Sequence, residues 1–299
     1  MATTGVYGFS YDDQSMREDL LAILQNLSPT ENQLVSGLGT SAATSIRHET
    51  LIDTLSAVKD NSHPEGAAAT FNAVTSPARL ANYCQIFKQG FRVSDTERAV
   101  NTAAFNDRYQ YEATKALKMI KNDMEYALMR GSYATGTGSA ARQLRGVKLS
   151  CSLVTNQSGT SLSETILNDI FQMMWTNTGI QVNAVYGSMY LKRKISAFSA
   201  NATKYFTQDD RRLINAIDVY QADAASMVKL FAHRYVTVSG DTNYDLVALN
   251  EDFWKVAYLR KPTVIQTAKV GDSTDGQVTV EATLENQHPQ AGVYSIAHL

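Results

Sequence analysis

Five histidines and two cysteines are the side chains of this sequence that could hold a metal ion or act as nucleophiles. None of the histidines falls in an H-E-x-x-H or comparable ligand spacing; they stand at His48, His63, His233, His288 and His298. Cys84 and Cys151 are too few for a disulfide framework and too far apart for a C-x-x-C site. We expect no metal site, and we expect both cysteines to be buried free thiols.

Sequence patterns that would indicate an enzyme are either incomplete or missing. Residues 131–138 have the glycine spacing of a phosphate-binding loop, but Thr137 occupies the lysine position and the segment follows a helical pattern instead of a strand. No G-x-S-x-G sequence occurs, and the carboxylates are scattered without a spacing that selects a catalytic pair. We therefore expect no catalytic, cofactor-binding or metal-binding residue, no cofactor and no enzyme activity.

Basic residues gather at 192–194 and again at Arg211 and Arg212. Either group could meet phosphates or the carboxylates of a neighbouring subunit, although a solvated face explains them at least as well. Asn156 and Asn201 begin glycosylation sequences, which we attribute to chance because the N-terminus carries no secretory pattern.

Composition excludes several classes of protein. A hydrophobic content of 44% in 299 residues excludes a disordered chain, and no apolar run approaches the ~18 to 20 residues of a membrane-spanning helix. With 27 basic and 29 acidic residues, the net charge of -2 excludes strong steering of the whole protein toward nucleic acid. The 19% of charged residues is below the ~25% of ordinary globular proteins, which suits a surface partly covered by other subunits.

The first part of the chain predicts few core elements. One amphipathic helix is expected at 16–27, closed by Pro29, and residues 30–45 are rich in Ser, Thr, Gly and Ala. We expect residues 1–45 to form an extended arm. Residues 46–58 and 79–93 are strand-like around the turn-forming segment 59–69, which predicts a long two-stranded excursion that needs a partner surface.

The strongest helical pattern runs from about 106 to 130, with apolar residues at steps of three and four and a stop at Gly131. Ser161 and Glu164 have capping-box spacing before a second helix that should end near Gly179. A further helix is expected at 188–198, and strands are expected at 182–186, 216–221, 227–238, 246–249, 254–259 and 278–284. This order predicts the α+β class.

The order of these elements resembles that of the tailed-bacteriophage major capsid proteins with the Hong Kong 97-type shell fold. Local strings similar to the family occur throughout the chain: DTL at 53–55, EG at 65–66, RLANYCQIF at 79–87, VSDT at 93–96, the helix at 112–128, YLRKP at 258–262, AKVGD at 268–272 and EATLE at 281–285. The resemblance covers nearly the whole sequence.

The resemblance implies an arm at 1–45, an extended E-loop at 46–95, a peripheral domain at 96–150 and 251–299 with a long spine helix at about 106–130, and an axial domain at 151–250. It implies self-assembly through hexamers and pentamers into an icosahedral shell around a double-stranded DNA genome. Closed rings arise when heterologous contacts close a rotation, and a loop that reaches a neighbour joins the rings.

The partners implied by the resemblance are other copies of the chain, portal, scaffold or cement proteins, and weak non-specific contact with packaged DNA, without a membrane. The location implied is the virion, after synthesis and assembly in the host cytoplasm. Two alternatives remain: an encapsulin-like compartment that encloses a cargo enzyme, and an unrecognised hydrolase that uses scattered carboxylates. An enzyme would need a pocket with converging, strongly perturbed groups.

Overall fold

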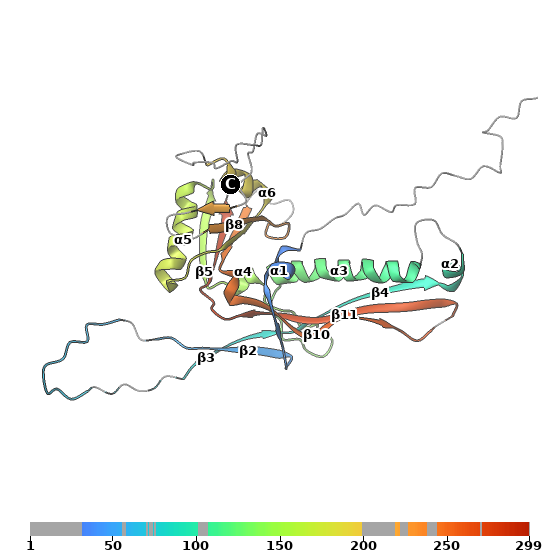
Figure 1. The fold of residues 1–299 in the computed structure, drawn as a ribbon, viewed down its shortest axis with the longest axis horizontal. Coiled ribbons are helices and arrows are strands. Elements are labelled where there is room, and N and C mark those ends of the chain that lie inside the picture. The colour runs from blue at the N-terminus through green and yellow to red at the C-terminus, as the bar shows by residue number, and fades with distance from the viewer. Residues whose placement is uncertain are drawn as a thin grey trace, which may run out of the picture.

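The computed structural model describes residues 32–298 except 56–57, 70, 72–73, 75, 101–106, 199–218, 222–226, 238–243 and 270. These residues form an elongated part, a more compact part beside one end of it, and a hairpin that projects from the body (Figure 1). The helix expected at 16–27 and the basic pair Arg211 and Arg212 lie outside the described residues. Among the described residues, every helix is too short or too polar to cross a membrane.

The elongated part is a helix on a sheet. Helix α3 (Arg108–Arg130) lies along a four-stranded sheet of order β1-β10-β11-β4, and Figure 1 shows the helix parallel to the long strands. The strands are β1 (Gly39–Ala42), β10 (Trp254–Gln266), β11 (Ser273–Asn286) and β4 (Gln85–Ser94). The short helices α1 (Gln33–Gly37), α2 (Asp95–Ala99) and α4 (Val147–Ser150) lie around α3.

The compact part is built on a six-stranded mixed sheet of order β5-β12-β9-β6-β8-β7. Its strands are β5 (Leu153–Thr160), β12 (Gly292–His298), β9 (Tyr244–Leu249), β6 (Ala184–Gly187), β8 (Met227–Ala232) and β7 (Val219–Gln221). The helices α5 (Glu164–Thr178) and α6 (Met189–Ser196) complete it, and the 3-10 turn η2 (Glu251–Phe253) leads back to β10.

An apolar stripe on α3 packs the helix against the sheet of the elongated part. Ala116, Ile120, Met124, Ala127 and Leu128 are buried at helical spacing, and they share one core with inward-facing residues of β4 and β11. The helix begins at Asp107, whose carboxylate accepts a 2.9 Å bond from the Tyr109 amide, and ends at Gly131. A Cβ at Gly131 would lie 2.5 Å from the Leu144 carbonyl oxygen, so this stop requires glycine. The helix expected at 106–130 is confirmed for its described residues.

Several boundaries differ from the sequence expectation. Residues 33–37 are helical instead of extended, because Leu34 and Leu38 are buried in the core beside α3, and β1 then pairs in parallel with β10. The helix α5 is capped by Ser163 instead of Ser161, although it ends at Gly179 as expected, with a φ of 70°.

The strand-like run at 79–93 is two strands instead of one. β3 (Ala78–Tyr83) pairs with β2 (Arg47–Ile52) in the hairpin, whereas β4 belongs to the four-stranded sheet. The break falls at Cys84, which is fully buried. Residues 85–94 therefore lie outside the projecting excursion that was expected to run to 95.

The final strand also departs from the expected division of the chain. β12 pairs with β5 and β9 in the six-stranded sheet, although residues 251–299 were expected to belong together with the long helix. Neither β5 nor β12 was expected. β5 carries polar Thr, Asn, Gln and Ser residues at a sheet edge, so its sequence lacks the apolar run that identifies a strand.

Replacing Ile120 with Asp tests the assignment of the two faces of α3. Ile120 is 2% exposed, so the variant should lose at least about 3 kcal/mol of unfolding free energy through lost packing and burial of a carboxyl group. Lys118→Glu on the exposed face should leave the thermal melting temperature within a few degrees of the parent. Equal melting temperatures for both variants would contradict the assignment.

Candidate functional site

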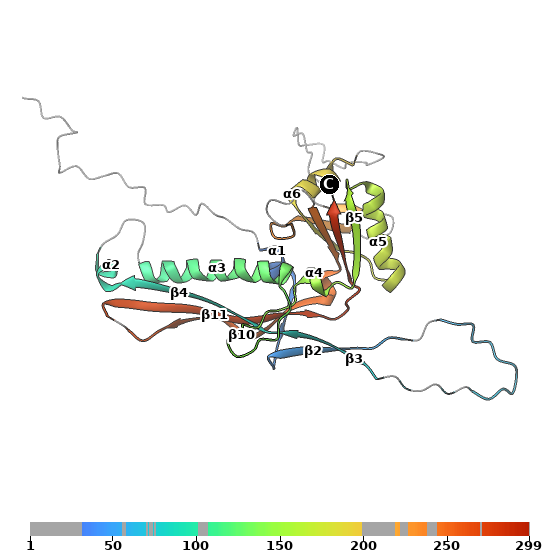
Figure 2. The ribbon, with the colours of Figure 1, turned by 180° about the vertical axis from the view of Figure 1, so that it is seen from behind.

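The β2–β3 hairpin carries an unusual concentration of exposed apolar side chains. Leu55, Val58, Phe71 and Val74 are each more than nine-tenths exposed, and they lie in the loop beyond the paired strands. Figures 1 and 2 both show this loop reaching away from the rest of the molecule. A two-stranded ribbon of this kind buries little apolar surface of its own, so its tip needs cover from another molecule.

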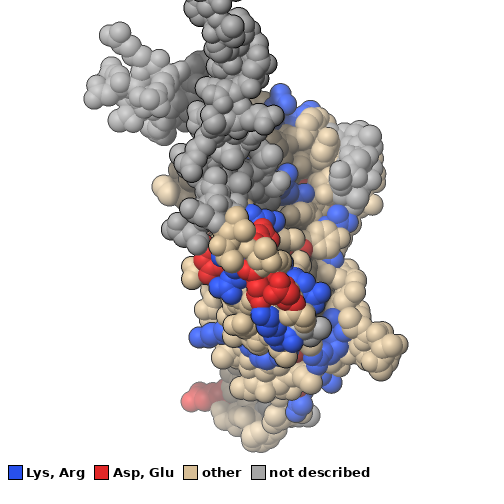
Figure 3. All heavy atoms as spheres, turned by 90° about the vertical axis from the view of Figure 1, so that its right-hand side faces the viewer, with Lys and Arg blue, Asp and Glu red and all other residues tan. Residues whose placement is uncertain are grey.

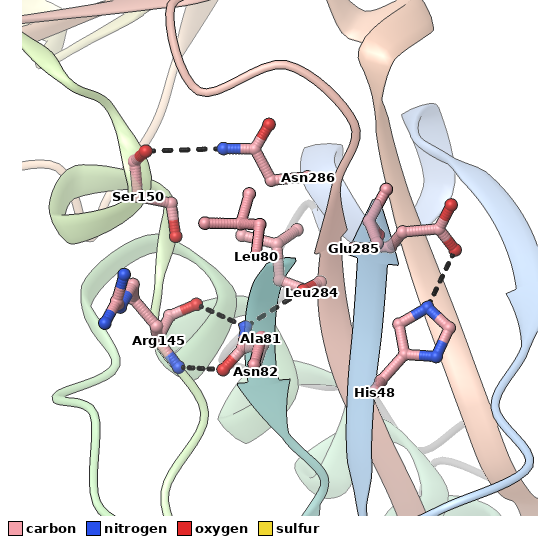
Figure 4. Close-up of a pocket in the computed structure, with 10 residues that line it drawn as sticks. His48, Leu80, Ala81, Asn82, Arg145, Ser150, Leu284, Glu285 and Asn286 are labelled. Carbon is pink, nitrogen blue, oxygen red and sulfur yellow. Dashed lines mark hydrogen bonds and ion pairs between the residues drawn. The ribbon is translucent and has the colours of Figure 1, made fainter. Parts of the chain in front are cut away.

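Asn82 fixes the base of the hairpin to the body. Its side-chain amide donates to the carbonyl oxygens of Arg145 (3.1 Å) and Leu284 (2.9 Å). Its side-chain oxygen accepts from the amides of Arg145 (2.7 Å) and Tyr83 (2.9 Å). Figure 4 shows Asn82 between these segments, so a single buried amide joins β3, the loop after α3 and β11.

A second contact at the base centres on the carboxyl group of Glu285. Nε2 of His48 on β2 lies 3.1 Å from Oε2 of Glu285 on β11, and the Ser41 hydroxyl of β1 donates to the same oxygen at 2.5 Å. Burial alone would raise the pKa of Glu285, but the hydrogen bonds from Ser41, Gln287 and His48 together hold it below its ordinary value. The carboxylate form of Glu285 therefore ties the hairpin to the sheet.

A small pocket lies between these two contacts, and its polar groups bond to one another. Figure 4 shows the Asn286 amide directed at the Ser150 carbonyl oxygen, 3.3 Å away, alongside the bonds of Asn82 and the His48–Glu285 pair. The residues around this pocket connect the hairpin to the body. It offers no free pair of acid and base in the described residues around the pocket.

The face of the four-stranded sheet that points away from α3 is basic. β4 places Ile86, Lys88 and Arg92 on this face, paired across to Glu281, Thr279 and Asp275 of β11. Glu281 is covered by Arg142 and Arg260, whose guanidinium nitrogens each lie 2.8 Å from one of its oxygens. Because Arg260, Lys88 and Arg92 are exposed while Glu281 and Asp275 lie beneath, the outer layer of this face is positive.

The far end of the elongated part mixes both signs of charge. Figure 3 looks onto this end and shows acidic and basic side chains side by side. Arg92 holds Asp275 through two 2.7 Å bonds, which lower the pKa of that carboxyl group, and a bond from Lys269 does the same for Asp95. Two further pairs join α2 to the start of α3, Arg98 with Asp107 and Arg108 with Glu97, and Arg108 also pairs with Glu112 one turn along α3.

The histidines that the sequence offered as metal ligands lie apart. His48 pairs with Glu285, His233 pairs with Glu125, and the buried His298 lies 2.8 Å from the Ser295 hydroxyl. Burial lowers the pKa of His298. No group of three or more possible metal ligands comes together among the described residues.

Both cysteines are buried free thiols, as expected. Burial raises the pKa of the Cys84 thiol to about 11, so it is poorly suited to act as a nucleophile at neutral pH. The glycine-rich segment at 131–138 forms a small bridged loop after α3, with Thr137 bridged to Ala140, and does not follow a strand. Of the basic cluster, Lys194 on α6 donates to the Ser161 hydroxyl at 3.1 Å.

Sequence patterns did not identify Asn82, Glu285 or Glu125 as important residues. Asn82, Glu285 and Glu125 form hydrogen bonds with residues 63, 244 and 91 positions away, respectively. Pairings over such distances leave no local spacing in the sequence. The projecting hairpin was expected from the sequence, because the linker at 59–69 is too long for a tight turn, but its exposed apolar side chains were not identified.

A family model described as SU10 major capsid protein matches residues 2–296 of this chain. Among curated proteins, the major capsid protein of Escherichia phage Phieco32 is 28% identical over 127 residues, which are 42% of this chain and 36% of that protein. The chain thus aligns with little more than a third of that relative's length.

Solved shells have the same fold. The capsid of the native GTA particle matches with a TM-score of 0.68 at 10% identity over 97% of each chain. The capsid of Myoviridae Phage XM1 matches at 0.64 and 11%, over 98% of this chain and 99% of that one. The holo-SrpI encapsulin complex of Synechococcus elongatus PCC 7942 matches at 0.61 and 10%, over 93% and 91%. The expected Hong Kong 97-type fold of the α+β class is confirmed.

The hairpin base should loosen in acid. A carboxyl group whose folded pKa is lowered stabilises the native contact fully above its ordinary pKa of 4.5, and this contribution is lost as pH falls through the lowered value. Hydrogen exchange at pH steps from 6 to 3 should therefore show β2 and β3 losing protection before α3. Glu285→Gln should make the hairpin less protected at pH 6 and should remove the pH step. A step that persists in Glu285→Gln would contradict this account.

Proposed function

Because the chain belongs to the SU10 major capsid protein family, we propose that its copies assemble through hexamers and pentamers into an icosahedral shell around the double-stranded DNA genome of a tailed bacteriophage. As a capsid protein it is a structural component of the virion, and its function resides in surfaces that contact other copies. Obligate interfaces of this kind bury about 2,000 to 5,000 Å² or more, which fits the low content of charged residues.

The domains of such a shell subunit follow the two sheets. We assign residues 46–84 to the E-loop, whose paired strands are β2 and β3. We assign the four-stranded sheet with α3 to the peripheral domain, with α3 as the spine helix, and residues 151–250 together with β12 to the axial domain. Residues 1–45 are the arm, of which α1 and β1 are seated on the peripheral domain.

One observation carries the proposal. The E-loop displays four almost fully exposed apolar side chains on a ribbon that leaves its own subunit. Exposed apolar groups of this number are unfavourable in water and are stabilised when a second surface covers them. A neighbouring copy provides such a surface at every position of a closed ring, because the same loop and the same receiving face recur around it.

The open face of the peripheral sheet suits this loop as its receiving surface. Between residues 53 and 77 the loop has three carboxylates, Asp53, Asp60 and Glu65, and one lysine, so it is acidic. The receiving face is positive through Lys88, Arg92 and Arg260. A shallow hollow beside it is lined by the exposed Ile86 and by Gly136, Gly138, Ala140 and Ala141, which leave room for an apolar side chain.

An encapsulin-like compartment is the second candidate, because the encapsulin of Synechococcus elongatus shares the fold. The two functions differ in what the shell contains. Purified particles with packaged DNA support the phage head, whereas particles with a co-purified enzyme support the compartment. We place assembly in the host cytoplasm and expect portal, scaffold or cement proteins as further partners, with weak non-specific contact to the packaged DNA.

Replacing Leu55, Val58, Phe71 and Val74 together with Ser tests the role of the E-loop. The unassembled subunit should keep its helical circular dichroism and melting temperature, because these side chains have no core of their own. Shell formation, measured by sedimentation, should need at least about tenfold more protein, because about 0.8 kcal/mol is lost for each buried CH₂ group that is removed. Deleting residues 61–69 should likewise prevent closure.

A matched control replaces three polar residues of the same loop, Asn61, Ser62 and His63, with Ala. This variant alters the loop without removing apolar surface and should assemble like the parent. Normal shells from the four-serine variant would contradict the role of the E-loop, whereas the absence of any shell from the parent chain would contradict the proposed function itself.

A further inference from the structure

Glu125 is a fully buried carboxylate at the place where three separate elements meet. It lies on the spine helix α3, one turn after Lys121 and on the same side of the helix. Its Oε1 accepts from the Leu34 amide and lies 2.8 Å from Nε2 of His233, and its Oε2 accepts from the Val35 amide at 2.8 Å. Both oxygens are thus committed to residues from outside the helix.

The first set of partners belongs to α1. The first amides of a helix have no partner within it and are usually satisfied by the side chain of the preceding residue. Asn32 precedes α1, and its side chain makes no such bond. Glu125, which lies on a different helix, accepts the hydrogen bonds of these amides in place of Asn32. Its negative charge is also favourable at the positive N-terminal end of α1. Lys121 adds a 2.9 Å bond to the Ser36 hydroxyl.

The second partner belongs to the axial domain. His233 follows β8, and its own amide donates to the Gly187 carbonyl oxygen at 2.8 Å. Nδ1 of its ring accepts from the Tyr235 amide at 3.2 Å, so the ring hydrogen lies on Nε2 and is donated to Glu125. The ring is held edge-on between Tyr186 and Tyr235, which fixes its direction toward the spine helix.

Through these bonds, the position of the axial domain affects how firmly α1 is held on the peripheral domain. If the axial domain shifts so that His233 leaves Glu125, a buried carboxylate loses one of three bonds, and an incompletely paired buried charge is costly. The remaining two bonds hold α1, and α1 leads directly into β1, whose four residues pair with residues 255–258 of β10. Loss of the His233 bond therefore weakens the seating of residues 33–42.

We propose that Glu125 couples the seating of α1 and β1 on the peripheral domain to the position of the axial domain, through its simultaneous bonds to Leu34, Val35 and His233. Coupling of this kind is reciprocal, so contacts that displace α1 also loosen the axial domain. A neighbour that moves one of these elements thereby changes the other within the same subunit. Glu125 and His233 are positioning residues in this arrangement.

Hydrogen exchange on the full chain tests the coupling in the direction from His233 to α1. His233→Leu removes the donor, and exchange of the Leu34 and Val35 amides and of β1 should accelerate by about tenfold or more, since bonds to charged groups are among the stronger ones. His233→Gln retains an amide donor at a similar reach and should restore protection to near that of the parent.

A matched control comes from His298, which is also fully buried in the six-stranded sheet but bonds to Ser295, outside this junction. His298→Leu should destabilise the axial domain without changing exchange at residues 34–42. Acceleration there by His298→Leu as large as that by His233→Leu, or no acceleration by His233→Leu, would overturn the proposal.

A second variant keeps the proposal testable if His233→Leu fails to fold. Val35→Pro removes the donor to Oε2, and with it part of the packing of the Val35 side chain against the core, at a position in the first turn of α1. The His233 amide should then exchange faster, whereas unchanged exchange at His233 would contradict reciprocity.

Discussion

The packing of the apolar stripe of α3 against one face of the β4–β11–β10 sheet determines the arrangement of the remaining elements. Ile120, Met124 and Leu128 share a core with Phe87, Val278 and Val280, so one face of the sheet is fully occupied. The opposite face is left open along the long strands, with its arginines and lysine at the surface. The same packing thus builds the elongated part and leaves its other sheet face available for the contacts proposed above.

The hairpin has no comparable packing, and its stability depends on its base. Asn82 and the His48–Glu285 pair attach β2 and β3 to the four-stranded sheet, while the loop beyond residue 52 contributes exposed apolar groups. The body therefore has a core of its own, whereas the described apolar residues of the hairpin loop are exposed. A well-packed unit of α3 and its sheet, combined with an exposed apolar loop, suits a chain that becomes part of a shell.

Local patterns in the sequence were sufficient to predict the long helix, the helix that ends at Gly179 and most of the buried strands. Apolar spacing at Ile120 and Met124, and a left-handed glycine at 179, are properties of short segments. The strand β12 and the helix α1 could not be predicted in this way, because their positions depend on pairing with β5 and on burial of Leu34 beside α3. The capping of α1 by Glu125 joins residues 91 positions apart, so no local pattern contains it.

A cryo-electron microscopy reconstruction of the assembled particle tests the central claim most directly, because it shows what covers the E-loop. The account predicts a closed icosahedral shell in which Leu55, Val58, Phe71 and Val74 are buried against the peripheral sheet of an adjacent copy, with Asp53, Asp60 or Glu65 near its arginines. A closed shell in which these four side chains remain exposed to solvent, or fold back onto their own subunit, would contradict it.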